Sequence, residues 1–192
     1  PANYTAWTNA PDFALIPANS SWRALSPAAE PATTWKDRLF SDEAWQTGIA
    51  PLGYNDPKQN MDCATVLDYG GNPSDRFPAA FFRKTFTAIN PAVITGMVVN
   101  ARINDGMVVY LNGTEVLRQN MPDGTVTRTT LASTNAPTTL WTSVLLPASG
   151  LVQGANVVAV EVHQASVTSA DLVFDMTVTA LVNEQVPIIH GQ

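Results

Sequence analysis

An Asn-Gly pair between two apolar runs is the feature that most restricts how this chain can fold. Residues 107–111 (Met-Val-Val-Tyr-Leu) and 115–118 (Glu-Val-Leu-Arg) flank the sequence Asn112-Gly113-Thr114. A two-residue hairpin turn needs positive φ at both central positions, which glycine adopts freely and asparagine tolerates. The sequence therefore predicts a β-hairpin with its tight turn at Asn112 and Gly113.

Short apolar or alternating runs, bounded by Gly, Asn, Asp and Pro, predict the other strands. Strands are expected at residues 21–25 (an edge strand), 64–69, 81–87, 93–103, 127–131, 138–146, 157–164 and 171–182. Alternation places Val158, Val160 and Val162 in the core. One helical turn is expected at residues 41–44, with Ser41 as a possible N-cap. Many short strands and little helix indicate an all-β, antiparallel β-sandwich, and the long irregular connections favour a jelly roll.

The chain length fits one domain of this class. Its 192 residues are enough to bury a sizeable core, so residues 1–192 are expected to form a single β-sandwich domain. The core should span about residues 35–182. Residues 1–34 are expected to pack on it as a strand and long loops, and residues 183–192 to form a tail or linker.

Charge and cysteine content restrict the partners and the location. The net charge is −6 and no basic run is present, so we expect no nucleic-acid partner. No apolar run is long enough to span a bilayer, so we expect no membrane insertion. One cysteine allows no intrachain disulfide. The few lysines and the Thr- and Asn-rich loops favour a secreted protein, extracellular or at the cell surface.

Four stretches of the sequence resemble a known family. They are residues 45–54 (Trp-Gln-Thr-Gly-Ile-Ala-Pro-Leu-Gly-Tyr), residues 82–86 (Phe-Arg-Lys-Thr-Phe), residues 105–116 with the hairpin turn, and residues 151–175 with Val-His-Gln and Asp-Leu-Val-Phe-Asp. The pattern resembles the galactose-binding-like β-sandwich and is similar to the sugar-binding domain of family 2 glycoside hydrolases. It is also similar to accessory domains of large secreted bacterial proteins. The resemblance covers about residues 35–182. It implies a jelly roll of eight or more strands, often attached to enzymes, without catalytic residues of its own.

One strand carries a candidate polar site. Glu161 and His163 are two residues apart and therefore share a face. Asn100 and Arg102 are expected on the outer face of the same sheet, with Tyr110 nearby. Such a face could bind a polar ligand such as a sugar. The favoured alternative is a solvated sheet face with ion pairs and cross-strand pairs.

Aromatic side chains supply a second candidate. Exposed tryptophans could stack on sugar rings, and Trp7, Trp35 and Trp141 are expected to be exposed. Trp22 and Trp45 are expected in or beside the core. The alternative for all five is core burial, because tryptophan is highly buried on average.

A structural Ca²⁺ site is a third expectation. Asp56 and Asp62 lie in a polar loop, and Asp171 precedes a strand, so carboxylate and backbone oxygens are available as hard ligands. A solvated loop is the alternative. One cysteine and two histidines give no zinc-ligand spacing.

The leading functional hypothesis is a non-catalytic carbohydrate-binding or accessory module of a secreted bacterial multidomain protein. Its partners would be a carbohydrate or neighbouring protein domains. The alternative is a structural or adhesive module that packs against neighbouring domains or against copies of itself. A third alternative is a hydrolase that uses Glu161 and His163. It is weaker because the sequence contains none of the common nucleophile, zinc-protease or phosphate-loop motifs.

Overall fold

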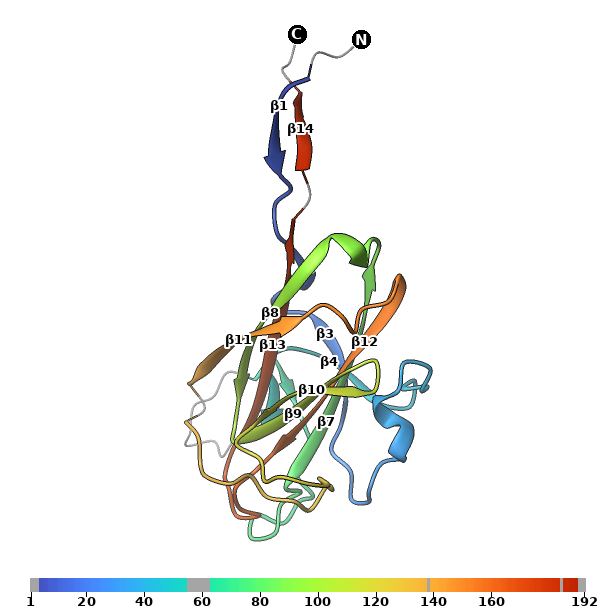
Figure 1. The fold of residues 1–192 in the computed structure, drawn as a ribbon. Coiled ribbons are helices and arrows are strands. Elements are labelled where there is room, and N and C mark those ends of the chain that lie inside the picture. Colours follow the sequence, from blue (N-terminus) through green and yellow to red (C-terminus); the bar gives the residue numbers. More distant parts are fainter. Residues whose placement is uncertain (1–3, 55–62, 138, 184, 190–192) are drawn as a thin grey trace.

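Two packed sheets form the body of the protein. A computed structural model describes residues 4–54, 63–137, 139–183 and 185–189 (Figure 1). The first sheet has the order β10 (Thr114–Gln119), β9 (Gly106–Leu111), β12 (Gly154–His163), β7 (Ala79–Ala88), β3 (Ser21–Leu25) and β4 (Gln46–Ile49). The second sheet has the order β11 (Trp141–Pro147), β8 (Ile94–Ile103), β13 (Leu172–Val182), β5 (Leu52–Tyr54) and β6 (Thr65–Val66), and β2 (Phe13–Ile16) also pairs with β13.

The strands run antiparallel except where β5 pairs with β6. Short 3₁₀ helices, η1 (Thr33–Lys36) and η2 (Pro91–Val93), are the helical segments of the described residues. No helix in that part of the chain has the length and apolar content needed to cross a membrane. The expected all-β sandwich is confirmed, while its jelly-roll connectivity stays a prediction.

The core lies between the two sheets and follows the period of two in each strand. Val158, Val160 and Val162 are buried in it, as the alternation predicts. The facing side chains of β8 and β13 complete it: Met97, Val99, Ala101, Ile103, Leu172, Phe174, Met176, Val178 and Ala180. Phe82 of the first sheet stacks on Phe174 of the second, with 4.0 Å between ring centroids. The apolar stripes of the two sheets therefore hold the layers together.

The predicted hairpin turn is confirmed. Asn112 and Gly113 connect β9 and β10, and their φ angles are 52° and 91°. The Asn112 side chain accepts from the Val157 amide at 2.9 Å and donates to the Gly150 carbonyl at 2.9 Å. It also donates to the side-chain oxygen of Asn156 at 2.8 Å. The turn is thereby fixed to the neighbouring loop.

Asn156 is fully buried and completes this joint. Its amide group donates to the carbonyls of Val152 and Gly154, and its oxygen accepts from the Val152 amide. Two of these three bonds join the side chain to Val152, which lies in the loop before β12 and outside the strand ladders. Asn156 therefore replaces strand pairing in the loop before β12.

Several local predictions were wrong. At residues 41–44 the expected turn is present, with the Trp45 amide donating to the Asp42 carbonyl at 3.0 Å, but it forms no helix, and the nearby 3₁₀ helix is η1. Residues 127–131 form a turn rather than a strand, because the hydroxyls of Thr127, Thr129 and Thr130 bond to one another and to the local backbone. The strand at residues 21–25 pairs on both sides and is not an edge. The strand expected at residues 64–69 is limited to β6, and β5 lies outside the expected strands.

A separate two-stranded ribbon joins the ends of the described chain. β1 (Tyr4–Asn9) pairs antiparallel with β14 (Gln185–Ile189), so part of the expected tail is a strand. Figure 1 shows this ribbon projecting away from the sandwich, beyond the end of β13. The ribbon therefore extends the fold along one direction and adds nothing to the core between the sheets.

Replacing Asn156 by alanine should strongly destabilise the fold. Asn156→Ala removes the bonds to Val152, Gly154 and Asn112 and leaves buried backbone groups unpaired, so we expect a loss of about 2–4 kcal/mol in unfolding free energy. Urea denaturation followed by fluorescence measures it. The exposed Asn135 provides the control, since Asn135→Ala should change stability by less than about 0.5 kcal/mol. Equal effects of the two variants would contradict the assigned role.

Candidate functional site

Three aligned rows of side chains cover the outer face of β11, β8 and β13. Alternate residues of β8 enter the core, so the intervening residues of these strands point away from it. The strand registers then define an open face of nine residues: Trp141, Arg102 and Asp175; Ser143, Asn100 and Thr177; Leu145, Val98 and Thr179. This face contains an indole, an ion-pair combination, an amide and hydroxyl groups. It therefore combines an apolar platform with hydrogen-bonding groups on a rigid sheet.

Trp141 begins the first row and is 47% exposed. Its exposure was expected and is confirmed. Leu145, two rows along the same strand, is 65% exposed. A large aromatic side chain that remains accessible on a sheet face offers a flat apolar surface to a ligand.

Arg102 and Asp175 lie opposite each other in the same row, and both are half-buried. Burial raises the pKa of the Asp175 carboxyl, while the Arg102 guanidinium and the Met176 amide partly oppose that shift. The Nε of Arg102 and the Oδ1 of Asp175 are both buried without a hydrogen-bond partner among the described residues. These two atoms are screened from solvent, so contact with a ligand on this face falls to the more accessible parts of the two side chains.

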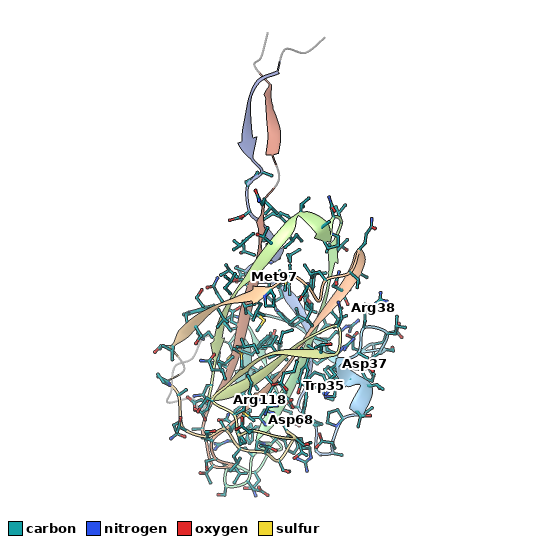
Figure 2. All side chains as sticks on the ribbon, in the orientation of Figure 1. Trp35, Asp37, Arg38, Asp68, Met97 and Arg118 are labelled. Carbon is teal, nitrogen blue, oxygen red and sulfur yellow. The ribbon has the colours of Figure 1, made fainter. Side chains whose placement is uncertain are left out.

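The outer face of the first sheet is different because loops cover it. Trp35 of η1 is 6% exposed and lies edge-on to Phe81 and Tyr110, with ring centroids 5.0 and 5.7 Å apart. Figure 2 shows Trp35 beside this sheet rather than at a loop tip. The expectation that Trp35 is an exposed platform was wrong, because its ring packs on the apolar outer face of the first sheet. Trp45 packs in the same cluster, and Trp22 is buried between the sheets, as expected.

Tyr110, Glu161 and His163 form a buried polar chain beneath these loops. The Tyr110 hydroxyl donates to Oε1 of Glu161 at 2.6 Å, and Oε2 of Glu161 lies 3.2 Å from Nε2 of His163. Nδ1 of His163 lies 2.8 Å from the Thr130 carbonyl. Burial, followed by the bond to Glu161, raises the pKa of the Tyr110 hydroxyl. The expectation of a solvated face at these residues was wrong.

The geometry requires a shared proton between Glu161 and His163. The Thr130 carbonyl can only accept, so Nδ1 of His163 must carry a hydrogen. A neutral imidazole would then turn a bare Nε2 toward a carboxylate oxygen, and two lone pairs would face each other. One proton therefore lies between Nε2 and Oε2, as an imidazolium–carboxylate or an imidazole–carboxylic acid pair. Glu161 is 4% exposed and His163 is 0% exposed. The hydrogen-bonded network of Tyr110, Glu161 and His163 therefore lies in the interior and does not face solvent.

The expected grouping of five polar residues divides between the two sheets. Tyr110, Glu161 and His163 come together in the first sheet. Asn100 and Arg102 belong to β8 of the second sheet, so placing them with Glu161 was wrong. The reason is pairing: β8 lies between β11 and β13 and not beside β12. Asn100 and Arg102 instead share the open face with Trp141.

The remaining expected residues are scattered. Trp7 lies in β1 of the ribbon, and its side chain is outside the described part of the structure. Asp56 and Asp62 also fall outside the described residues. Burial and then the charge of Asp105 raise the pKa of the Asp171 carboxyl, and the Asp171 carbonyl accepts from Gln164. No group of three or more His, Cys, Asp or Glu within the described ranges could hold a metal ion. A Ca²⁺ site at these positions stays a prediction.

Asp175, Thr177 and Leu145 are members of the open face that sequence reasoning did not select. Alternation in residues 171–182 already placed Asp175 and Thr177 on the polar side of their strand. Their neighbours became visible only with the register of β13 against β8. A polar residue on the non-core side of a long strand is the signal that could have identified them.

Comparison with solved structures finds this fold within larger glycosidases. β-Glucuronidase 2 of Bacteroides uniformis, covalently bound to cyclophellitol-6-carboxylate aziridine, has 15% identity and a TM-score of 0.57. A β-glucuronidase from glycoside hydrolase family 2 has 12% identity and a TM-score of 0.53. A family 2 member from Bacteroides cellulosilyticus DSM 14838 has 13% identity and a TM-score of 0.52. The alignments cover 92%, 91% and 90% of this chain but 18%, 18% and 21% of those chains. No protein-family model and no curated protein matches the sequence.

The likeness confirms the fold that the sequence resemblance implied: a small β-sandwich of the kind present in family 2 glycoside hydrolases. This chain spans about a fifth of the length of those enzymes. At such low identity the agreement concerns the fold and not the side chains of either outer face.

Substitutions at Glu161 should separate hydrogen bonding from charge in the buried chain. Glu161→Ala leaves the Tyr110 hydroxyl and Nε2 of His163 buried without partners and should cost about 2–4 kcal/mol of unfolding free energy. Glu161→Gln should cost less than about 1 kcal/mol, because its oxygen still accepts from Tyr110 and its amide donates to neutral His163. Chemical denaturation measures both, with the exposed Glu43→Ala as the control. Equal losses for alanine and glutamine would contradict the shared-proton arrangement.

Proposed function

We propose that this chain is a non-catalytic carbohydrate-binding module of a larger secreted protein, and that the open face is its binding surface. The observation that carries the proposal is the first row of that face. Exposed Trp141 is aligned with the half-buried Arg102 and Asp175, which place a guanidinium and a carboxylate beside the indole. The row supplies both kinds of contact that a sugar ring needs.

The chemistry of the face suits a pyranose ring. The apolar side of the ring can stack on the Trp141 indole, which offers large contact area with little loss of rotamer freedom. The hydroxyl groups around the ring both donate and accept, so they can bond to Arg102, Asp175 and Asn100. All four side chains come from regular strands, which hold them more rigidly than loops do.

The fold likeness supports this assignment. The similar solved structures are glycosidases, and in each of them the aligned part is a minor share of a longer chain. A sandwich of this kind is therefore found attached to carbohydrate-processing enzymes. The same role is proposed for this chain, with the open face as the part that contacts the glycan.

The burial of Glu161 and His163 argues against the hydrolase alternative. Glu161 and His163 are buried under η1 and the segment before β11, and they bond to each other and to Tyr110. A substrate bond cannot reach a general acid or base in that position without removal of the covering loops. The open face is accessible in the structure as it stands.

Removing the Trp141 indole should weaken glycan binding. A glycan array with the full chain identifies a bound sugar, and calorimetry then compares the wild type with Trp141→Ala. We expect at least about a tenfold loss of affinity, which corresponds to ~1.4 kcal/mol, a typical energy for an aromatic contact. The melting temperature should change little, because Trp141 is half-exposed at a sheet edge.

Ile89→Ala is the matched control, since Ile89 is also exposed but lies outside the open face. Its affinity for the same glycan should equal that of the wild type. If Trp141→Ala binds every array glycan as tightly as the wild type does, the open face is not the binding surface. If the wild type binds no glycan on the array, the carbohydrate function itself is contradicted.

A second candidate function, a structural or adhesive module, is favoured by the edge strand β11. This strand ends the second sheet, and the described chain pairs it on one side only, with β8. Residues 129–160 contain no Asp, Glu, Lys or Arg, although natural edge strands are often protected by charge. A second copy of the chain could add antiparallel to this edge. Pairing centred on Ser143 would place Leu145 opposite Trp141 of the other copy.

A charge on the β11 edge should abolish such self-association. Leu145→Lys replaces the apolar contact with Trp141 of the other copy by a charge on the strand edge and should raise a dimer dissociation constant by at least about tenfold. Sedimentation velocity over a concentration series measures the effect, and Ile89→Lys at another exposed site is the control. A wild type that stays monomeric throughout the series contradicts this second candidate.

A further inference from the structure

A positively charged hollow of about 400 Å³ opens between β3 and β7. The ladder between these strands covers only Arg23 to Leu25, so the start of β3 separates from β7 beyond the Arg23–Arg83 pair. The hollow lies where the strands diverge, and Asp42 and Thr47 form part of its wall. It belongs to the first sheet, whereas the open face belongs to the second.

Three of the ten lysine and arginine residues of the chain line this hollow: Arg23, Arg83 and Lys84. One carboxylate, that of Asp42, lies among them. The chain as a whole has a net charge of −6. The local excess of positive charge is therefore opposite in sign to the rest of the molecule and would attract an anion.

Arg83 does not supply the free donors. It is 1% exposed, and its Nε donates to Oδ2 of Asp42 at 2.9 Å. Its Nη atoms donate to the carbonyls of Trp35, Asp37 and Phe40. Arg83 thus holds the covering loop and pairs with Asp42, whose other oxygen lies 3.7 Å from Nε of Arg23. One carboxylate cannot neutralise three cations, so the hollow keeps an excess of positive charge for a ligand.

Arg23 and Lys84 keep unused donors at the hollow. Nη1 of Arg23 donates to the Trp45 carbonyl at 3.3 Å and to the Thr47 hydroxyl at 2.6 Å, while no described acceptor bonds its Nη2. Nζ of Lys84 has three hydrogens and donates one of them, to the Ser21 carbonyl at 2.9 Å. The indole Nε1 of Trp22, another lining residue, is buried and lacks an acceptor within the described chain.

We propose that this hollow binds a compact oxyanion: the carboxylate, sulfate or phosphate group of a small molecule. Guanidinium and ammonium donors form short, charge-assisted bonds to such oxygens, and these bonds are stronger than those between neutral groups. The exposed hydroxyls of Thr47 and Thr85 at the rim can add neutral hydrogen bonds. The proposal is independent of the open face, because the two sites share no residue and lie on different sheets.

The test is an amide NMR titration of the full chain with acetate, sulfate and inorganic phosphate, each at constant ionic strength set by NaCl. We expect saturable shifts confined to residues 21–23, 47 and 83–85, with a dissociation constant on the order of millimolar. Saturation by acetate alone would identify a carboxylate ligand. Saturation by sulfate or phosphate alone would identify a tetrahedral oxyanion.

Lys84→Met and Arg23→Met should each weaken binding by at least about tenfold, because each removes one charged partner. Arg38→Met is the matched control: Arg38 is exposed, does not line the hollow and lies beside Asp37 on the covering loop (Figure 2). If a methionine variant loses the dispersed spectrum of a folded chain, the corresponding glutamine variant replaces it.

Two results would overturn the proposal. One is the absence of saturable shifts at the hollow up to about 50 mM of all three anions, a concentration well above the expected dissociation constant. The other is unchanged binding in both Arg23 and Lys84 variants, which would show that the anion binds elsewhere. A loss in those variants together with wild-type binding in Arg38→Met supports the site.

Discussion

The chemical difference between the two outer sheet faces determines the rest of this structure. A sheet packed on one side must either solvate its other face or cover it. The first sheet presents Phe81, Val108, Val157 and Ala159 outward, and these apolar groups are removed from water only if loops fold over them. The second sheet presents Arg102, Asn100, Asp175 and threonines, which can remain hydrated. The uncovered sheet face therefore belongs to the second sheet, and the covered one to the first.

The covering of the first sheet depends on a buried cation. Arg83 projects from β7 and bonds to the carbonyls of Trp35, Asp37 and Phe40 and to the carboxylate of Asp42. These groups lie on a segment with little regular pairing, so the guanidinium supplies the partners that a ladder would otherwise provide. The bonds hold the Trp35 ring over the sheet. The bond to Asp42 also places that carboxylate in the wall of the charged hollow. Arg83 therefore positions both the covering loop and part of the hollow.

The sequence predicted what depends on neighbouring residues and failed where distant ones decide. Alternation identified the core side of β8 and β12 correctly, and the turn at Asn112 and Gly113 followed from local φ requirements. The sheet to which Asn100 and Arg102 belong was assigned wrongly, because strand order is set by contacts between segments far apart in the chain. The burial of Trp35 was missed for a similar reason: alternation identifies a face but not the loop that covers it.

The ribbon of β1 and β14 has a mechanical consequence. Its outer ends, near Tyr4 and Ile189, lie side by side, and its hydrogen bonds run across the strands. Tension that pulls those two ends apart acts along the hydrogen bonds and loads them one pair at a time. It does not load all the pairs together, as a shear force would. The ribbon would open stepwise at low force, and the ladders of the sandwich would bear load only after the last pair, Asn9 with Gln185, had separated. Under tension applied at these two ends, the ribbon would therefore lengthen before the sandwich is loaded.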